Sequence, residues 1–188
     1  MYFILTFTLL FIGVCWICSK CIIKGIEKDF NNKEKYNKKA QMKLISKSID
    51  KLDGNQFEQF CVKLLTMNNY KAEQTKATRD GGKDIILKTK KEKIFIECKH
   101  YAENNKINTT HIHKLISACI VDNVKHGIFI TTSNYTADAI ELSKSSKLVR
   151  IDLLYKDDLL HLCNNIDRNR LLEWLGYDES YIKGFCRA

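Results

Sequence analysis

The chain has 188 residues with a formal net charge of +9, and 45% of its residues are hydrophobic. This length suits one globular domain with an extension, and the sequence contains no repeats or low-complexity tracts. Most of the charge is local, because residues 20–51 hold ten lysines against four acidic residues, whereas residues 52–188 carry only +3. The basic charge alone therefore does not make the folded body a nucleic-acid-binding protein.

The first 18 residues, MYFILTFTLLFIGVCWIC, contain no charged side chain. With the residues up to 23 they approach the ~20 apolar residues with which a helix spans a bilayer. The segment lacks the basic start and the small-residue cleavage site of a signal peptide. Lysines follow it and none precedes it, which by the positive-inside rule keeps the C-terminal side in the cytoplasm. We therefore expect a transmembrane anchor at residues 1–23, a membrane as partner, and a single-pass membrane protein with its folded body in the cytoplasm.

Residues 24–51 are polar and rich in lysine, and we expect them to form a basic cytoplasmic tether, either a solvated helix or a flexible chain, that is attracted to an anionic leaflet. The folded body is expected at residues 52–165, and a C-terminal packing helix and tail at 166–188. Asp53, Gly54 and Asn55 supply the start signals of the first helix of the body, whose apolar residues recur at helical spacing. The patterns that follow predict strands at 70–75, 85–87, 94–96, 127–132 and 148–153, and helices at 110–122, 136–145 and 156–164. This order predicts an α/β sandwich with a central mixed β-sheet flanked by helices.

The second and third of these strands carry charged residues beside apolar runs. Because strand side chains alternate, Glu97 and Lys99 point to the same face of the sheet. A two-residue loop at 90–91, or a four-residue loop at 89–92, pairs position 84 with position 97, whereas a loop of three or five residues does not. With either of the first two loops, Asp84 and Glu97 face each other with their Cβ atoms roughly 4.5–5.5 Å apart.

Two carboxylates at this distance repel each other, and a divalent cation offsets the repulsion. Mg²⁺ is typically held by one or two carboxylates and keeps several of its waters, and Mn²⁺ is a second candidate. Lys99 lies on the same face, where it can orient an attacking water or stabilise charge on a phosphate. The adjacent Gly81 and Gly82 allow a ligand to approach the backbone closely. Positive charge for phosphate contacts is supplied nearby by Lys76, Arg79 and Lys83.

A simpler explanation is that Asp84 marks the start of a strand and that Glu97 and Lys99 form a weak ion pair on a solvated edge. Alternating polar positions are common in strands, so the spacing alone does not exclude it. The apolar runs around these residues favour the first explanation, because an exposed hairpin would not contain them.

The segments FEQF, DGGKDIIL, IECKHY and GIFITTSNYTADAIELS resemble, in order and spacing, the Mrr-type catalytic domain of type IV restriction endonucleases, within the PD-(D/E)xK nuclease superfamily. The resemblance runs from about residue 53 to residue 162. It implies a restriction-endonuclease-like fold and a Mg²⁺-dependent DNA endonuclease whose catalytic core is Asp84, Glu97 and Lys99, with Asp84 and Glu97 as metal ligands. Many members of this group have Gln where this chain has Glu97, and the carboxylate favours metal binding.

The resemblance further suggests that Glu58, on the first helix of the body, assists the metal site. Asn55 and Glu58 also match a capping box in which Glu58 bonds back to the Asn55 amide, so both explanations stay open. His111 and His113 lack the spacing of a shared metal face and are expected to be solvated.

The function predicted from the sequence is thus a membrane-anchored, Mg²⁺-dependent DNA endonuclease with a restriction role. A structure-specific nuclease such as a Holliday-junction resolvase and a noncatalytic DNA-binding module are the alternatives. The sequence does not fix the oligomeric state, and a homodimer is one arrangement that we consider.

Overall fold

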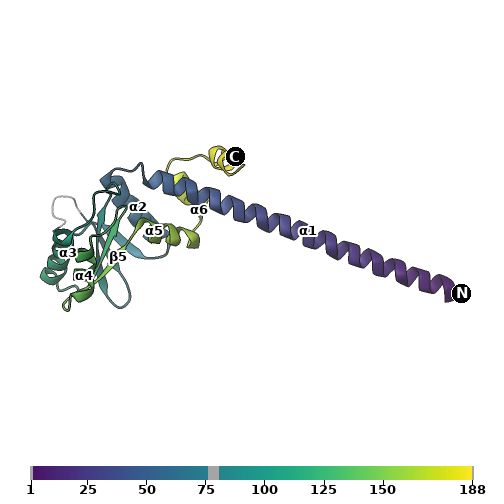
Figure 1. Cartoon of the computed structure of the whole chain (residues 1–188), viewed down its shortest axis with the longest axis horizontal. Coiled ribbons are helices and arrows are strands. Elements are labelled where there is room, and N and C mark those ends of the chain that lie inside the picture. Colours follow the sequence, from purple (N-terminus) through teal and green to yellow (C-terminus); the bar gives the residue numbers. More distant parts are fainter. Residues whose placement is uncertain (1, 76–80, 188) are drawn as a thin grey trace.

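The computed structural model describes residues 2–75 and 81–187, without the side chains of residues 2–19, 21, 22 and 187. A five-stranded sheet with helices on both faces forms the body, and one long helix projects from it (Figure 1). The elements are α1 (Tyr2–Ile49), α2 (Gly54–Met67), β1 (Lys71–Gln74), β2 (Ile85–Lys88), β3 (Lys93–Lys99), α3 (Thr109–Val121), β4 (His126–Thr131), α4 (Ala137–Ser145), β5 (Arg150–Leu154), α5 (Lys156–Leu162), the 3₁₀ turn η1 (Cys163–Asn165), α6 (Arg168–Trp174) and α7 (Glu179–Arg187).

The sheet is mixed, as the sequence predicts. Its strands lie in the order β1-β2-β3-β4-β5, and they are antiparallel from β1 to β3 and parallel from β3 to β5. The chain length between strands explains this change, since a tight turn joins only antiparallel neighbours whereas parallel strands need a crossover. The turn at residues 89–92 joins β2 to β3, while α3 and α4 provide the two crossovers.

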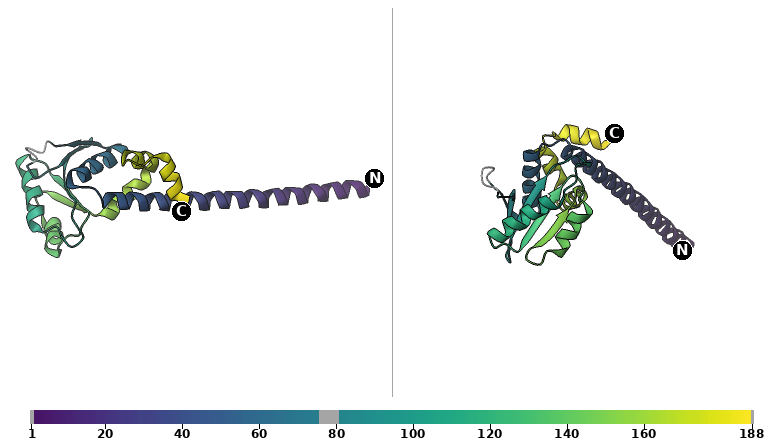
Figure 2. Two further views of the ribbon diagram at one scale, coloured as in Figure 1. Left: turned by 90° about the horizontal axis from the view of Figure 1, so that it is seen from above. Right: turned by 60° about the vertical axis from the view of Figure 1, so that its left-hand side comes forward.

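The two faces of the sheet bury separate cores. Ile94, Ile96 and Cys98 of β3 belong to the core covered by α2, α5, α6 and the end of α1. Phe95 belongs to the core under α3 and α4. Residues 97 and 99 have the same parity as Phe95, so they lie on the face that α3 covers. Figures 1 and 2 show α3 and α4 together on one side of the sheet.

Helix α1 corrects the expectation for the N-terminus. It is one helix of 48 residues that projects away from the body in all the views of Figures 1 and 2. The apolar start continues without a break into lysine-bearing turns, and Leu44, Ile45 and Ile49 in the last turns are buried in the core. None of the helices in the described part of the chain is both long enough and apolar enough to cross a membrane. The predicted transmembrane anchor at residues 1–23 and the single-pass membrane localisation are therefore wrong, and a membrane as partner is not supported.

The C-terminal region contains two helices where the sequence suggests one. Helices α6 and α7 are separated at Gly176, which has a φ of +92°, a left-handed conformation that ends a helix readily. Leu171 and Leu172 of α6 and Ile182 of α7 are buried against the core that includes the end of α1. The predicted boundaries at residues 51/52 and 165/166 stay predictions, although the core is continuous across both.

Candidate active site

The hairpin has the predicted register. Ile85 pairs with Ile96 and Lys88 with Lys93, and the Thr89 amide donates to the Glu92 carbonyl across the turn. These pairs have the alignment that the sequence predicts, and they end at Ile85. Beyond them the Asp84 amide donates to the Ile96 carbonyl at 2.8 Å, which is one position out of the register of the ladder. That position 84 directly faces position 97 therefore stays a prediction.

Asp84, Glu97 and Lys99 come together on the face of the sheet that α3 covers. The Lys99 Nζ lies 2.7 Å from Glu97 Oε1 and 3.8 Å from Asp84 Oδ2. The two acidic residues are buried, with 5% and 7% of their surface exposed, whereas 28% of the Lys99 side chain is exposed. The arrangement is thus not an ion pair on a solvated edge, because both carboxylates lie below the surface.

Backbone groups fix the position of Asp84. Its Oδ2 accepts a hydrogen bond of 2.7 Å from the Cys98 amide, and its carbonyl accepts one of 2.8 Å from the Thr75 amide. On its N-terminal side, Gly82 has a φ of +85° and lies so close to α3 that an added Cβ would be 3.3 Å from the Lys114 carbonyl oxygen. The carboxylate is therefore held in place before any ligand binds.

The charges around Lys99 keep it protonated. Burial lowers the pKa of its ammonium, but the hydrogen bond that the ammonium donates to Glu97 and the charges of Glu97 and Asp84 outweigh burial and raise the pKa of Lys99 above its ordinary value. The cluster gathers carboxylate oxygens from two buried side chains, and oxygen atoms of this kind are the ligands that a hard divalent cation prefers.

A cavity of about 870 Å³ opens beside the cluster, between the Gly81–Gly82 segment, β3 and α3. Glu97 and Lys99 form part of its floor, and α3 supplies one wall. The residues on this wall include Thr110, His111, His113, Lys114 and Ser117.

Comparison with known proteins shows the family to which the chain belongs. Residues 49–163, more than half of the chain, match the restriction endonuclease model Mrr_cat. The chain belongs to this restriction endonuclease family. Helices α2 to α5 and the whole sheet lie within the matched residues.

Individual proteins show more distant similarity. The uncharacterised protein y4cE of Sinorhizobium fredii (strain NBRC 101917 / NGR234) is 28% identical over 106 residues, which are 53% of this chain and 27% of that protein. The DNA modification-dependent restriction endonuclease AspBHI shares the fold with a TM-score of 0.56 and 20% identity, over 72% of this chain and 39% of that one. The structure of the MspJI restriction endonuclease with a 27-mer oligonucleotide has a TM-score of 0.46 and 12% identity, over 80% and 36% of the two chains. The chain thus spans less than half of each of these proteins.

The donor set of this restriction endonuclease domain fits a hard divalent cation. Asp84 and Glu97 would provide the oxygen ligands, since an oxygen of each lies within 4 Å of the Lys99 ammonium, and the adjoining cavity leaves room for water. Within the described residues, no group of three or more His, Cys, Asp or Glu side chains is placed to hold a metal. Two carboxylates with water and phosphate oxygens meet the needs of Mg²⁺ or Mn²⁺, whereas a zinc site would require more protein ligands.

The other predicted site residues have different outcomes. Lys76 and Arg79 lie outside the described residues. The Lys83 Nζ is 2.8 Å from Asp122 Oδ2 and 4.5 Å from the centre of the Phe95 ring, so this ammonium already has contacts within the protein. Its predicted contact with phosphate stays a prediction.

Glu58 lies on α2, where its Oε2 accepts a hydrogen bond of 3.2 Å from Gln74. The capping box of this helix is formed by Asp53 and Gln56. The alternative in which Glu58 caps Asn55 is therefore wrong, and a role of Glu58 at the metal stays a prediction.

The sequence analysis missed the contribution of α3. His111 was expected to be solvated, but it lies half-buried with its ring near the rings of Tyr101 and Phe129, at the cavity wall. Burial and the charges of Lys114 and Lys99 lower the pKa of His111, so its ring is neutral near pH 7. Polar residues on one side of an amphipathic helix were the only available signal, and most such faces merely contact solvent.

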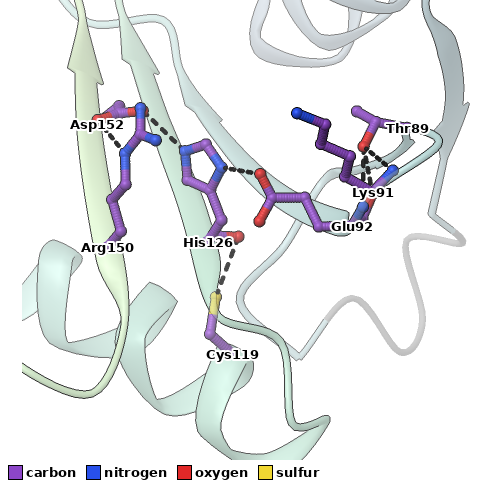
Figure 3. A network of polar contacts seen from close by, with 7 residues as sticks. All are labelled: Thr89, Lys91, Glu92, Cys119, His126, Arg150 and Asp152. Carbon is purple, nitrogen blue, oxygen red and sulfur yellow. Dashed lines mark hydrogen bonds and ion pairs between the residues drawn. The ribbon is translucent and has the colours of Figure 1, made fainter.

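A second polar network lies at the opposite end of the parallel strands, at the start of β4 and β5. The buried His126 ring contacts Asp152 Oδ2 through Nε2 at 2.7 Å and Glu92 Oε1 through Nδ1 at 3.2 Å (Figure 3). The Arg150 guanidinium pairs with Asp152 at 2.6 Å. No pattern in the sequence pointed to this network, because its members come from three separate strand ends.

Proposed function

We propose that the protein is a Mg²⁺-dependent DNA endonuclease that hydrolyses phosphodiester bonds in a restriction role. One observation carries the proposal: two buried carboxylates converge beside an ammonium, within a domain of the restriction endonuclease family. Neither a solvated ion pair nor a core polar contact requires two buried acids beside an open cavity.

Each residue of the cluster has a defined task in this proposal. Asp84 and Glu97 hold the metal, and Mn²⁺ can replace Mg²⁺. When bound, the cation polarises a phosphoryl oxygen and makes a bound water more acidic. The Cys98 amide fixes the Asp84 carboxylate, so little ordering is required when substrate arrives.

Lys99 acts on the substrate side of the cluster. Its raised pKa keeps it charged at physiological pH, and part of its side chain is exposed to the cavity. A permanent positive charge there stabilises the negative charge that develops on phosphate oxygens in the transition state. A neutral amine would not, which is why the two carboxylates beside Lys99 matter for its function.

DNA phosphate enters through the cavity in this proposal. Lys76, Arg79 and Lys83 remain the proposed phosphate contacts, and Lys114 on α3 adds positive charge at the wall of the cavity. Glu58 is a further proposed carboxylate for the metal site.

The direct test measures cleavage of plasmid DNA in Mg²⁺, in Mn²⁺ and in EDTA by the full chain. Unmodified and cytosine-methylated plasmids are both included, because AspBHI is a modification-dependent enzyme. We expect cleavage with either metal, none in EDTA, and none for Asp84→Ala. Lys99→Ala should lower the rate about 10²–10³-fold, the usual cost of losing one stabilising donor.

A matched control is Glu73→Gln, which removes an exposed carboxylate of the same sheet from its pair with Lys88. This variant should cleave at the wild-type rate. Cleavage that persists in EDTA, or that survives both Asp84→Ala and Lys99→Ala, would refute the proposal.

A further inference from the structure

A groove of about 430 Å³ lies between α1 and α7, outside the residues that match the restriction endonuclease family. Its position and chemistry are therefore not explained by the family relationship. It is lined by Tyr36, Lys39, Ala40, Lys43, Lys47 and Phe185.

The two walls of the groove are fixed to each other at both ends. Near one end the Ser48 and Tyr177 hydroxyls are 3.0 Å apart, and near the other the Cys186 thiol donates to the Asn37 carbonyl at 3.8 Å. Helix α7 thus runs antiparallel to the last turns of α1. The buried Ile182 holds this packing in place.

One wall carries a row of positive charge. Lys39, Lys43 and Lys47 are spaced four residues apart, so they share one side of α1 and span about 12 Å. Residues 35–47 contain five lysines and no acidic residue. Lys38 is paired with Glu34, whereas the three groove lysines form no ion pair with any residue that the structure describes.

The same groove presents aromatic rings. The Tyr36 side chain is 56% exposed and Phe185 is half-buried. The Phe185 ring continues a stack with Tyr181 and Tyr177, with ring centres 6.4 Å and 5.2 Å apart. Tyr181 is 51% exposed, so a large part of these aromatic rings lies on the surface and is not explained by packing in the core.

We infer that this groove is a second nucleic-acid site and that its ligand is single-stranded DNA. The three lysines contact successive phosphates, and the Tyr36 and Phe185 rings stack on unpaired bases. Surfaces that bind single strands combine these two features, since every base has a π face and every nucleotide a phosphate. Duplex DNA would use the lysines but leave the rings without a partner, and an acidic peptide would do the same.

This site goes beyond the proposed cleavage reaction, because it needs neither the metal nor the buried carboxylates. Binding is therefore measured in EDTA with the full-length Asp84→Ala protein, so that a failure of the cleavage proposal does not affect the result. The probe is a fluorescein-labelled oligothymidylate of about 12 nucleotides, followed by fluorescence anisotropy, with a duplex of the same length and a polyglutamate peptide as competitors.

Three variants are compared in this background. Lys39→Gln, Lys43→Gln and Lys47→Gln are combined in the first, and Tyr36→Ala is the second. The control combines Lys24→Gln, Lys28→Gln and Lys33→Gln, which removes the same charge from exposed positions of α1 outside the groove. All of the substituted residues are on the surface, and circular dichroism verifies that each variant keeps its helices.

The groove triple variant should bind the oligonucleotide at least tenfold more weakly, with the slope of log K against log salt reduced by about 2, as expected for three phosphate contacts on a single strand. Tyr36→Ala should weaken binding about tenfold, the effect of losing one stacked base. The control triple should change binding less than twofold. Equal weakening by the control triple, no effect of Tyr36→Ala, or preferential competition by the duplex or polyglutamate would overturn the inference.

Discussion

Two polar clusters at opposite ends of the same parallel strands show how differently one sheet can use charge. In the cluster of Asp84, Glu97 and Lys99 the acids are buried and the base is partly exposed. In the network of Figure 3 the base is buried, since 6% of His126 is exposed, while the Glu92 and Asp152 side chains are 45% and 36% exposed.

The two clusters differ in how far their carboxylates are exposed to water. Water and Arg150 compensate the carboxylates around His126, so this network can stabilise the fold without any ligand. The carboxylates around Lys99 are buried, and a cavity that Glu97 and Lys99 help to line opens beside them, where the proposed cation would bind. The network around His126 therefore suits structure, and the cluster around Lys99 suits chemistry at the expense of stability.

The largest expected effect separates the two clusters directly. Asp84→Asn should lower DNA cleavage on the order of a thousandfold or more, because the proposed metal loses a charged ligand. The amide oxygen can still accept from the Cys98 amide, so the free energy of unfolding in EDTA should stay the same or rise. Cleavage assays and urea unfolding in EDTA measure both, and a large loss of stability would show that Asp84 is a structural residue.

Glu97→Gln should have a smaller effect on the same reaction. It removes one charge but keeps an oxygen ligand, and many proteins that the sequence resembles have Gln here. We expect Mg²⁺ to bind about 10–100-fold more weakly, with cleavage recovering at high Mg²⁺. Calorimetric titration and cleavage rates over a range of Mg²⁺ concentrations test this, and an unchanged Mg²⁺ affinity would exclude Glu97 as a ligand.

His126→Phe should show the reverse pattern to Asp84→Asn. Two charge-assisted hydrogen bonds are lost, so the free energy of unfolding should fall by about 2 kcal/mol, while the cleavage rate of the folded protein stays within twofold. His161→Phe, on the exposed surface of α5, is the matched control and should change neither quantity. A strong loss of cleavage in folded His126→Phe would contradict a purely structural role.

The smallest effect is a pH dependence at alkaline pH. The folded state raises the pKa of Lys99 above its ordinary value of 10.5, so this interaction contributes stability that is fully present below that pH and is lost as the pH rises through the folded pKa. The wild type should therefore lose more stability than Lys99→Met between pH 9 and pH 12 in EDTA. Between pH 6 and pH 9, the protonation of Lys99 should not change, so it should cause no rise or fall of the cleavage rate in this range. Parallel stability curves for the two proteins would show that the carboxylates do not hold the Lys99 proton.

The sequence determined the hairpin, because strand alternation and loop length are local rules. Once Lys90 and Lys91 form the turn, Ile85 must pair with Ile96, and Lys99 must lie on the same side of the sheet as Glu97. The mixture of antiparallel and parallel strands was predictable for the same reason, because short connections join antiparallel neighbours and helical crossovers join parallel ones. The position of helix α2 was also predicted correctly, although its capping box is formed by Asp53 and Gln56 and not by Asn55 and Glu58.

Only the tertiary structure decided which distant segments meet. It placed α3 beside Lys99, it joined His126 to Glu92 and Asp152, and it made the lysine-rich segment one wall of a groove with Phe185. It also showed that the apolar N-terminal residues belong to a helix whose other end is buried in the core. The physical reason is range: periodicity and turn length act between near neighbours, whereas packing across a sheet depends on the complete set of faces that must be buried together.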